Sequence, residues 1–296
     1  MLKPDEAMAF NTFLQSGKIE DYMRYVGVKR QAQATAAKTP RPRGKTVHIT
    51  TEAIVLRARS VDEFDCVLTL LTKERGVISA YARGAKKPRG TLRVPTELLS
   101  YSCFVLFSNK ERYSVDRADL EGVFMGVRGD VCKLSLASYL CELTAETAPR
   151  GESAGEYLRL LLNSLYMLDR DKRACAFIKP LYELRLLTMA GYMPNLVACR
   201  GCGCFESELI YFLPLTGELA CGECIADAPP DQPRMRLSAG VLAAMRHILY
   251  APFERLFAFT LPQEQLVYLG EVTQYYVQVQ LDKRFPTLDF YLTIKD

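Results

Sequence analysis

The chain has 296 residues, of which 49% are apolar and 24% charged, a composition typical of globular proteins with packed cores. Its apolar runs are all shorter than the ~18 residues that a membrane-spanning helix needs, so we expect no membrane partner. The first residues include acids and lack an apolar signal segment, which argues against secretion. Ten cysteines without an export signal indicate a reducing compartment, and we predict a cytoplasmic location.

Residues 1–46 are predicted to form an N-terminal extension, a short helical leader followed by a basic, proline-containing linker. The net charge of the whole chain is +4, but residues 38–93 contain 13 basic and five acidic residues. A basic segment within a mildly acidic remainder favours a polyanionic partner for one domain. A solvated, soluble surface is the alternative interpretation of the same charges.

Residues 47–125 have the pattern of short strands. Strands are expected over 49–59, 66–72, 77–81, 98–107 and 113–123, with a turn at 108–110 before the last one. The turn at 73–76, which ends in glycine, predicts a hairpin. Five short strands in about 75 residues are typical of a small antiparallel barrel, of which the OB-fold is the common form. We therefore predict an OB-fold nucleic-acid-binding domain over 47–125.

From residue 126 onwards, apolar residues recur at helical spacing. Residues 209–213 instead resemble a strand, followed by a turn at 214–217. This pattern predicts an α-helical domain over 126–296 with a metal knuckle inserted at 196–228, and an α+β multidomain protein overall. The expected helices lie near 131–145, 158–165, 177–187, 241–248 and 266–276.

Two Cys-x-x-Cys pairs lie in this insert, with 18 residues between them. Two residues between paired thiolates let both sulfurs face one ion from a single turn, and two such pairs are typical of a structural zinc site. A closed four-sulfur site has no open position for a substrate, so it indicates a structural metal. Cys204 is expected to be spare, although it could substitute as a ligand. We predict one structural Zn²⁺ bound by Cys199, Cys202, Cys221 and Cys224.

A cationic loop follows the third expected strand. Residues 81–94 contain five basic residues and no acid, and their glycines and proline indicate a flexible loop. Such a loop beside a barrel can follow a phosphate backbone, because each neutralised phosphate releases counterions. A solubilising surface is again the alternative. Tyr81, Tyr101 and Tyr113 are candidates for stacking against bases.

The sequence offers little support for catalysis. His48 and His247 are its 2 histidines, too few for most Cys/His or Ser/His arrangements. Asp62, Glu63 and Asp65 could hold magnesium in a nuclease, but a loop between strands is the simpler interpretation. Hard-cation sites usually gather their ligands from separated elements. We expect the protein not to be an enzyme.

The stretch AIVLRARSVDEFDCVLTLLTKERGVISAYARGAKKPRG, residues 53–90, resembles the N-terminal region of the RecO family of bacterial DNA repair and recombination proteins. The shared features are a Val-Leu-Arg strand, an acidic loop, Leu-Thr-Leu, Glu-Arg-Gly at the hairpin and a Gly-Ala-Lys-Lys loop. Paired cysteines in a helical C-terminal domain fit the zinc-bearing members of that family. The resemblance covers residues 48–296, whereas residues 1–45 depart from it. Within them, the stretch AFNTFLQSGKIEDYMRYVGVKRQ, residues 9–31, resembles a short YqzL-like peptide.

The resemblance implies a non-enzymatic mediator of homologous recombination in the RecF pathway, acting in the cytoplasm at the nucleoid. Such proteins bind single- and double-stranded DNA, anneal complementary strands, and work with RecR to help RecA displace single-stranded-DNA-binding protein. The alternative is a zinc-stabilised protein-interaction adaptor with incidental DNA contact. By position, the DNA-binding candidates are the basic residues of the barrel: Arg57, Arg59, Lys73, Arg75, Arg83, Lys86, Lys87, Arg89 and Arg93.

Overall fold

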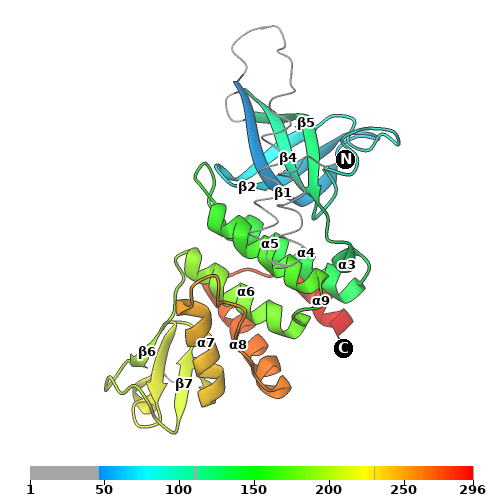
Figure 1. Cartoon of the computed structure of the whole chain (residues 1–296). Coiled ribbons are helices and arrows are strands. Elements are labelled where there is room, and N and C mark those ends of the chain that lie inside the picture. The colour runs from blue at the N-terminus through cyan, green and yellow to red at the C-terminus, as the bar shows by residue number, and fades with distance from the viewer. Residues whose placement is uncertain (1–46, 110–111, 230, 296) are drawn as a thin grey trace. The chain divides into compact units, whose positions relative to one another are not determined.

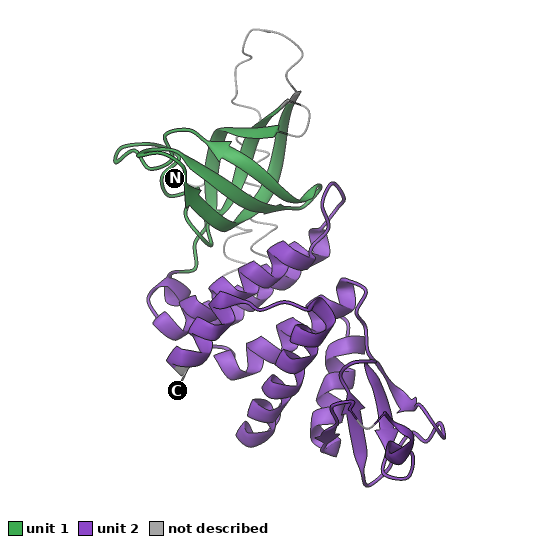
Figure 2. Cartoon of the chain, turned by 180° about the vertical axis from the view of Figure 1, so that it is seen from behind, with its two compact units in different colours: residues 1–124 green, residues 125–296 purple. Residues whose placement is uncertain are grey.

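The computed structural model describes residues 47–109, 112–229 and 231–295. The predicted extension and linker at 1–46, and part of the predicted turn at 108–110, lie outside these residues. The chain divides into two compact units after Phe124 (Figure 2). In the described part of the chain, no helix combines the length and the apolar character needed to cross a membrane.

The first unit is a closed five-stranded barrel (Figure 1). Four neighbouring pairs of strands are antiparallel, whereas β3 and β5, which close the barrel, pair in parallel. The predicted OB-type barrel is confirmed, but the expectation of a purely antiparallel one is wrong at the closing pair. In the order β1-β2-β3-β5-β4, the strands are β1 (Val47–Ser60), β2 (Cys66–Thr72), β3 (Gly76–Ala82), β5 (Arg112–Gly122) and β4 (Tyr101–Asn109).

The interior of the barrel is apolar. Alternate residues of each strand point inward, because successive strand side chains lie on opposite faces. Leu68 and Leu70 of β2 are fully buried, as are Phe104 and Leu106 of β4. This core supports the outer surface on which the predicted basic residues lie.

The second unit is mainly helical. Its helix α6 packs against α4, α5, α7 and α8. The five predicted helices are all present, and α3 and α9 are additional short helices whose apolar pattern is too brief to detect. The helices are α3 (Met125–Arg128), α4 (Val131–Thr147), α5 (Gly155–Asp169), α6 (Cys175–Met189), α7 (Ala239–Tyr250), α8 (Gln263–Leu281) and α9 (Pro286–Lys295).

A buried polar network joins α4, α6 and α8. Glu183 is fully buried and accepts hydrogen bonds from Tyr139 Oη (2.8 Å), Thr273 Oγ1 (2.7 Å) and Lys179 Nζ (3.1 Å). Lys179 also donates to the carbonyl of Gly270 at 3.0 Å. Burial and the neighbouring Glu183 raise the pKa of Tyr139, which keeps this phenol a neutral donor. Each buried charge therefore has hydrogen-bonding partners, as burial in a helical core requires.

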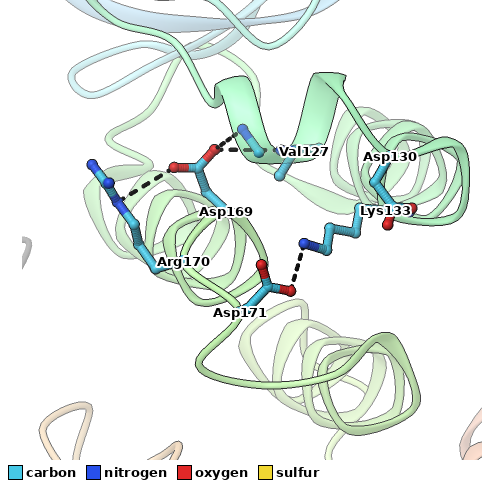
Figure 3. A network of polar contacts seen from close by, with 7 residues as sticks. Val127, Asp130, Lys133, Asp169, Arg170 and Asp171 are labelled. Atoms are coloured by element: carbon cyan, nitrogen blue, oxygen red, sulfur yellow. Dashed lines mark hydrogen bonds and ion pairs between the residues drawn. The ribbon is translucent and has the colours of Figure 1, made fainter.

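The first helix of this unit is fastened to the end of α5 (Figure 3). Asp169 Oδ1 accepts hydrogen bonds from the backbone N–H groups of Gly126 (2.7 Å) and Val127 (3.3 Å). These are N–H groups that the start of a helix leaves without a partner. A Cβ atom at residue 126 would lie 2.3 Å from the carbonyl oxygen of Asp169, so this close approach requires glycine. Beside it, Lys133 Nζ lies 2.6 Å from Asp171 Oδ1.

A small four-stranded sheet lies between α6 and α7 in the chain. It packs on α8 through the edge-to-face contact of Phe212 with Tyr276, whose ring centroids are 5.3 Å apart. The predicted strand at 209–213 corresponds to β7, but the other three strands were not predicted. In the order β6-β8-β7-β9, they are β6 (Asn195–Cys199), β8 (Glu218–Cys221), β7 (Ile210–Leu213) and β9 (Met235–Leu237).

Candidate metal centre and candidate nucleic-acid interface

The two cysteine pairs are brought together by the pairing of β6 with β8. Cys199 is the last residue of β6, and Cys221 is the last residue of β8. Because these two strands run parallel, their carboxyl ends lie at the same edge of the sheet. Cys202 and Cys224 follow in the turns after each strand, so both turns converge on one point.

The four sulfurs have the spacing of a metal site. Their Sγ atoms all lie within 4.8 Å of one another, and those of Cys202 and Cys221 are 3.7 Å apart. Four sulfurs at about 2.3 Å from a tetrahedral ion would be separated by about 3.8 Å. The predicted four-cysteine cluster is therefore confirmed, and its residues lie close enough to bind one metal ion.

Backbone groups favour the thiolate of Cys199. Burial alone would raise the pKa of Cys199, but N–H groups of the surrounding turns donate to its sulfur and together lower that pKa to about 6. Two of these donors are Gly201 (3.4 Å) and Cys221 (3.3 Å). A Cβ atom at residue 201 would lie 2.8 Å from Cys224 Sγ, so glycine is needed there. These backbone contacts thus favour the thiolate of Cys199, the form of the side chain that binds metals.

Cys204 lies beside this cluster but outside the group of four. The pKa of Cys204 is raised to about 12 by three effects. In order of size, these are the hydrogen bond to Cys202, burial, and the hydrogen bond to Cys221. The carbonyl oxygen of Cys204 accepts the N–H of Cys199 at 2.9 Å. Cys204 thus lies outside the group of four but contacts two of its sulfurs, and its role as a spare sulfur stays a prediction.

On the barrel, a β-bulge decides where the arginines of β1 point. Before the bulge, Val55 pairs with Leu70, and both face the core. After it, Arg57 pairs with Thr69, and Arg59 lies two residues farther along the same face. Regular alternation would have placed both arginines on the face of Val55. The bulge therefore moves both guanidinium groups to the outer surface, where both residues are exposed.

Tyr81 belongs to the same outer face. Val67 of β2 pairs with Arg59 on one side and with Tyr81 on the other, so these three residues form a row across β1, β2 and β3. Tyr81 is 37% exposed. Arg57 lies on the same outer face, two residues before Arg59. We call the three residues Arg57, Arg59 and Tyr81 of this face the basic row. It combines cations suited to phosphates with an aromatic face suited to a base.

The cationic loop, residues 83–93, packs on the barrel and contains several turns, and its predicted flexibility stays a prediction. Ala85 is buried in the barrel core, and Leu92 packs against that core. Between them, the N–H of Lys87 donates to the carbonyl of Gly84 at 3.1 Å, and further turns follow. The basic side chains that this loop exposes are Arg83, Lys86, Lys87, Arg89 and Arg93.

The loop is also fastened to residues 61–65, the acidic loop between β1 and β2. Asp65 accepts hydrogen bonds from the hydroxyl of Tyr81 and from the N–H of Gly84, the latter at 2.7 Å. These two bonds, in that order, lower the pKa of Asp65, and the nearby cations of the loop lower it further. The carbonyl of Phe64 accepts the N–H of Lys86 at 2.9 Å.

Lys73 and Arg75 lie elsewhere. They occupy the turn between β2 and β3, at the opposite end of the hairpin from Tyr81. The seven residues of β3 separate the two ends by about 20 Å, given the rise of ~3.3 Å per strand residue. Arg57 lies near the middle of the hairpin, opposite Thr69. The structure thus places Arg59 and the loop that follows β3 at the end of the hairpin near Tyr81, and leaves Lys73 and Arg75 at the other end.

Two of the three tyrosines predicted to stack on bases instead make contacts within the barrel. Tyr101 is 2% exposed and donates to Glu52 Oε2 at 2.9 Å, while Tyr113 packs against the barrel core. Among the described residues, the four cysteines are the one group of His, Cys, Asp and Glu side chains placed to share an ion. The magnesium interpretation of the acidic loop therefore gains no support.

Comparison with known proteins gives matches over both units. The family model described as "Recombination protein O N terminal" matches residues 47–124, and "Recombination protein O C terminal" matches residues 128–289. These matches fall on the barrel and on the helical unit with its knuckle.

The matches to similar proteins cover almost the whole length of each relative. A protein of Acetivibrio thermocellus named "DNA repair protein RecO" is 33% identical over 247 residues, 83% of this chain and 97% of the relative. The protein of the same name from Symbiobacterium thermophilum is 28% identical over 247 residues, 82% of this chain and 96% of the relative. Another from Caldanaerobacter subterraneus is 26% identical over 246 residues, 83% and 98% of the two chains.

The resemblance noted in residues 53–90 thus extends through the barrel, the helices and the four-cysteine centre. It indicates a role in DNA repair and recombination. The fold, the four-cysteine group and the sequence similarity agree, and the chain belongs to the RecO family.

Proposed function

We propose that this protein is a non-enzymatic mediator of homologous recombination that binds single- and double-stranded DNA and anneals complementary strands. The observation that carries the proposal is the basic row, which lies exposed on the barrel beside the anchored cationic loop. The cations of the basic row and of the loop form a surface that can neutralise several consecutive phosphates.

Annealing follows physically from this neutralisation. Two complementary strands repel each other through their phosphates, and a protein that covers those charges lowers the repulsion without reading the sequence. Tyr81 adds a stacking face for an unpaired base, worth about 1–3 kcal/mol where a base occupies it. No bond in the DNA is made or broken, so the activity requires no catalytic residue.

In this proposal the metal at the four cysteines is a single structural Zn²⁺. Four thiolates with tetrahedral spacing form the donor set that zinc prefers in closed sites. Zinc bound there would hold the ends of β6 and β8 and the two turns that follow them. Its role would be to stabilise the knuckle.

The partners proposed from family membership are RecR, single-stranded-DNA-binding protein and, indirectly, RecA. With RecR, the protein would help load RecA onto DNA that the single-stranded-DNA-binding protein covers, at the nucleoid in the cytoplasm. Mixing the purified proteins on covered single-stranded DNA and following RecA assembly tests this step. Assembly at an unchanged rate with and without the protein would contradict it.

A pair of double variants tests the DNA surface. Arg57→Ala with Arg59→Ala removes two cations from the basic row, and Lys73→Ala with Arg75→Ala removes two from the far turn. Both change the net charge equally. We expect weaker single-stranded DNA binding from the first and a small change from the second, measured by fluorescence anisotropy at several salt concentrations. Equal losses would show that net charge, rather than the basic row, governs binding.

A triple variant tests the cationic loop. Replacing Lys86, Lys87 and Arg89 with Ala should slow strand annealing and reduce the salt slope of single-stranded DNA binding by about 2, since each phosphate contact contributes ~0.7. An unchanged annealing rate and slope would remove the loop from the interface. In the same experiments, DNA kept with magnesium or manganese should stay intact, and its cleavage would contradict a non-enzymatic role.

The adaptor interpretation is the second candidate, and one observation favours it. A groove of about 1080 Å³ lies between the knuckle, α7 and α8, lined by Phe205, Ile210, Leu242 and Tyr268 among others. Such a partly apolar groove suits a protein partner. If the wild-type chain shows no salt-dependent DNA binding while it still binds RecR, the adaptor interpretation replaces the mediator.

A further inference from the structure

We propose that Asp65 is a positioning residue of the DNA site, which holds Tyr81 and the cationic loop in the arrangement that accepts an unpaired base. This inference rests on the proposed function, because it assigns a role within the same surface. It names the substrate class that the basic row favours, a single strand with accessible bases.

The geometry gives Asp65 an unusual position. Its two carboxylate oxygens bind two different elements. One accepts a hydrogen bond from the hydroxyl of Tyr81 on β3, and the other accepts one from the N–H of Gly84 at the start of the cationic loop. Gly84 has φ of 69°, the left-handed conformation that favours glycine. The bond from its N–H thus fixes the turn with which the loop leaves β3.

Neighbouring contacts reinforce the same junction. The N–H of Lys86 donates to the carbonyl of Phe64, at 2.9 Å, and Lys86 Nζ donates to Ser60 Oγ at the end of β1. The acidic loop itself is closed by the N–H of Val61, which donates to the carbonyl of Asp65 at 3.1 Å. The strand end, the acidic loop and the cationic loop are therefore tied together, with Asp65 at the centre.

An acid within a basic surface presents a paradox that the contacts resolve. A carboxylate repels phosphate, so electrostatics alone predicts that its removal strengthens DNA binding. Asp65 instead uses its charge within the protein, on a phenol and an amide N–H, beside Arg83 and Lys87. The loss of positioning is expected to outweigh the gain in charge.

The same contacts favour single strands. The hydroxyl of Tyr81 is fixed by Asp65, while the residue remains 37% exposed. A free base can stack on an exposed aromatic ring, whereas a base within a duplex is already stacked on its neighbours. A correctly placed Tyr81 therefore contributes to single-stranded binding and little to duplex binding.

Three variants of the full chain separate positioning from charge. Asp65→Ala removes both contacts, Asp65→Asn keeps an oxygen that can accept the Gly84 N–H, and Glu63→Ala removes an acid from the same loop outside these contacts. We expect oligothymidine binding to weaken about fivefold or more in Asp65→Ala, to weaken less in Asp65→Asn, and to stay equal or tighten in Glu63→Ala. Equal tightening in all three would overturn the proposal.

Two further measurements make the test specific. In a Tyr81→Ala background, Asp65→Ala should cause a smaller loss than in the wild-type chain, because only the contact with the Gly84 N–H remains to be removed; an equally large loss in both backgrounds would contradict the coupling to Tyr81. Duplex binding should change less than single-stranded binding. Unchanged far-ultraviolet circular dichroism and melting temperature would exclude unfolding as the cause. Absence of DNA binding by the wild-type chain would instead overturn the proposed function.

Discussion

The two units secure their candidate sites by opposite means. The barrel has an apolar interior, and its candidate interface consists of exposed side chains on two strands, β1 and β3, and on a loop. The helical unit buries a charged network around Glu183 and gathers four sulfurs at one sheet edge. The four sulfurs form one compact group that could hold a single ion, whereas each cation of the barrel is one of several.

The two sites should therefore differ in how strongly a single substitution affects them. A four-ligand centre and a buried ion pair depend on every member, so one change should abolish or greatly weaken them. A surface of screened charges depends on their sum, so one change should alter it gradually.

The largest effect is expected at the metal centre. Cys221→Ser should lose the bound zinc and unfold the knuckle, because the apparent free energy of zinc binding in such sites is about 10–16 kcal/mol. The matched control is Cys204→Ser, which should retain one zinc per chain. Metal analysis by mass spectrometry measures occupancy, and amide hydrogen exchange shows which strands lose protection.

Two results would weaken the contrast between the units. Full zinc occupancy in Cys221→Ser would mean that Cys204 replaces the missing ligand. Loss of protection in the barrel strands of the same variant would mean that the barrel depends on the metal centre for its fold.

A smaller but still large effect is expected in the buried network. Glu183→Gln leaves the ammonium of Lys179 buried without its carboxylate, and breaking such a pair costs about 3–5 kcal/mol. Combining Glu183→Gln with Lys179→Met also removes the buried ammonium and should recover part of the lost stability. Chemical denaturation measures the free energy of unfolding of the single and the double variant. A double variant less stable than Glu183→Gln would contradict this account.

The barrel core should respond through packing alone. Leu68 is fully buried there, and Leu68→Ala should lower the free energy of unfolding by about 2–5 kcal/mol through the cavity it leaves. Zinc occupancy should stay at one per chain. If this variant also loses zinc, the two units do not stabilise themselves separately.

The smallest effect concerns pH. The pKa of Asp65 is lowered from its ordinary 3.8, first by Tyr81 and then by Gly84, so the folded state favours its ionised form. The resulting stabilisation is present above pH 3.8 and is lost as the pH falls through the lowered value. An NMR titration should therefore show the Gly84 amide shifting below pH 3.8. A midpoint above 3.8 would contradict the contacts.

Features encoded by local spacing could be predicted from the sequence. The four cysteine ligands, the β2–β3 hairpin and the five longer helices each follow from residues close together in the chain. The parallel closing pair of the barrel depends on where β3 and β5 meet, and the pairing of β6 with β8 likewise joins distant segments. Propensity and periodicity carry no information about such contacts.

The candidate interface shows the same limit. Its basic residues were visible in the sequence, but their division between the two ends of the hairpin was not. Nor could the sequence show that Tyr101 is buried while Tyr81 is exposed, since both lie in similar strand patterns. The link from Asp65 to Gly84 joins residues 19 positions apart, and the acidic loop alone suggested a magnesium site or a plain loop between strands.

The bulge in β1 has a consequence for how this strand can change in length. Leu56 is the extra residue of the bulge: Val55 pairs with Leu70 and Arg57 with Thr69, so Leu56 has no partner position on β2. A chain without it would pair Arg57 with Thr69 in an unbroken ladder, with both arginines still outside. Loss of one residue elsewhere in the strand would exchange its two faces unless the bulge moved to compensate. When relatives of different length are aligned, a single-residue gap in this strand should therefore fall at position 56.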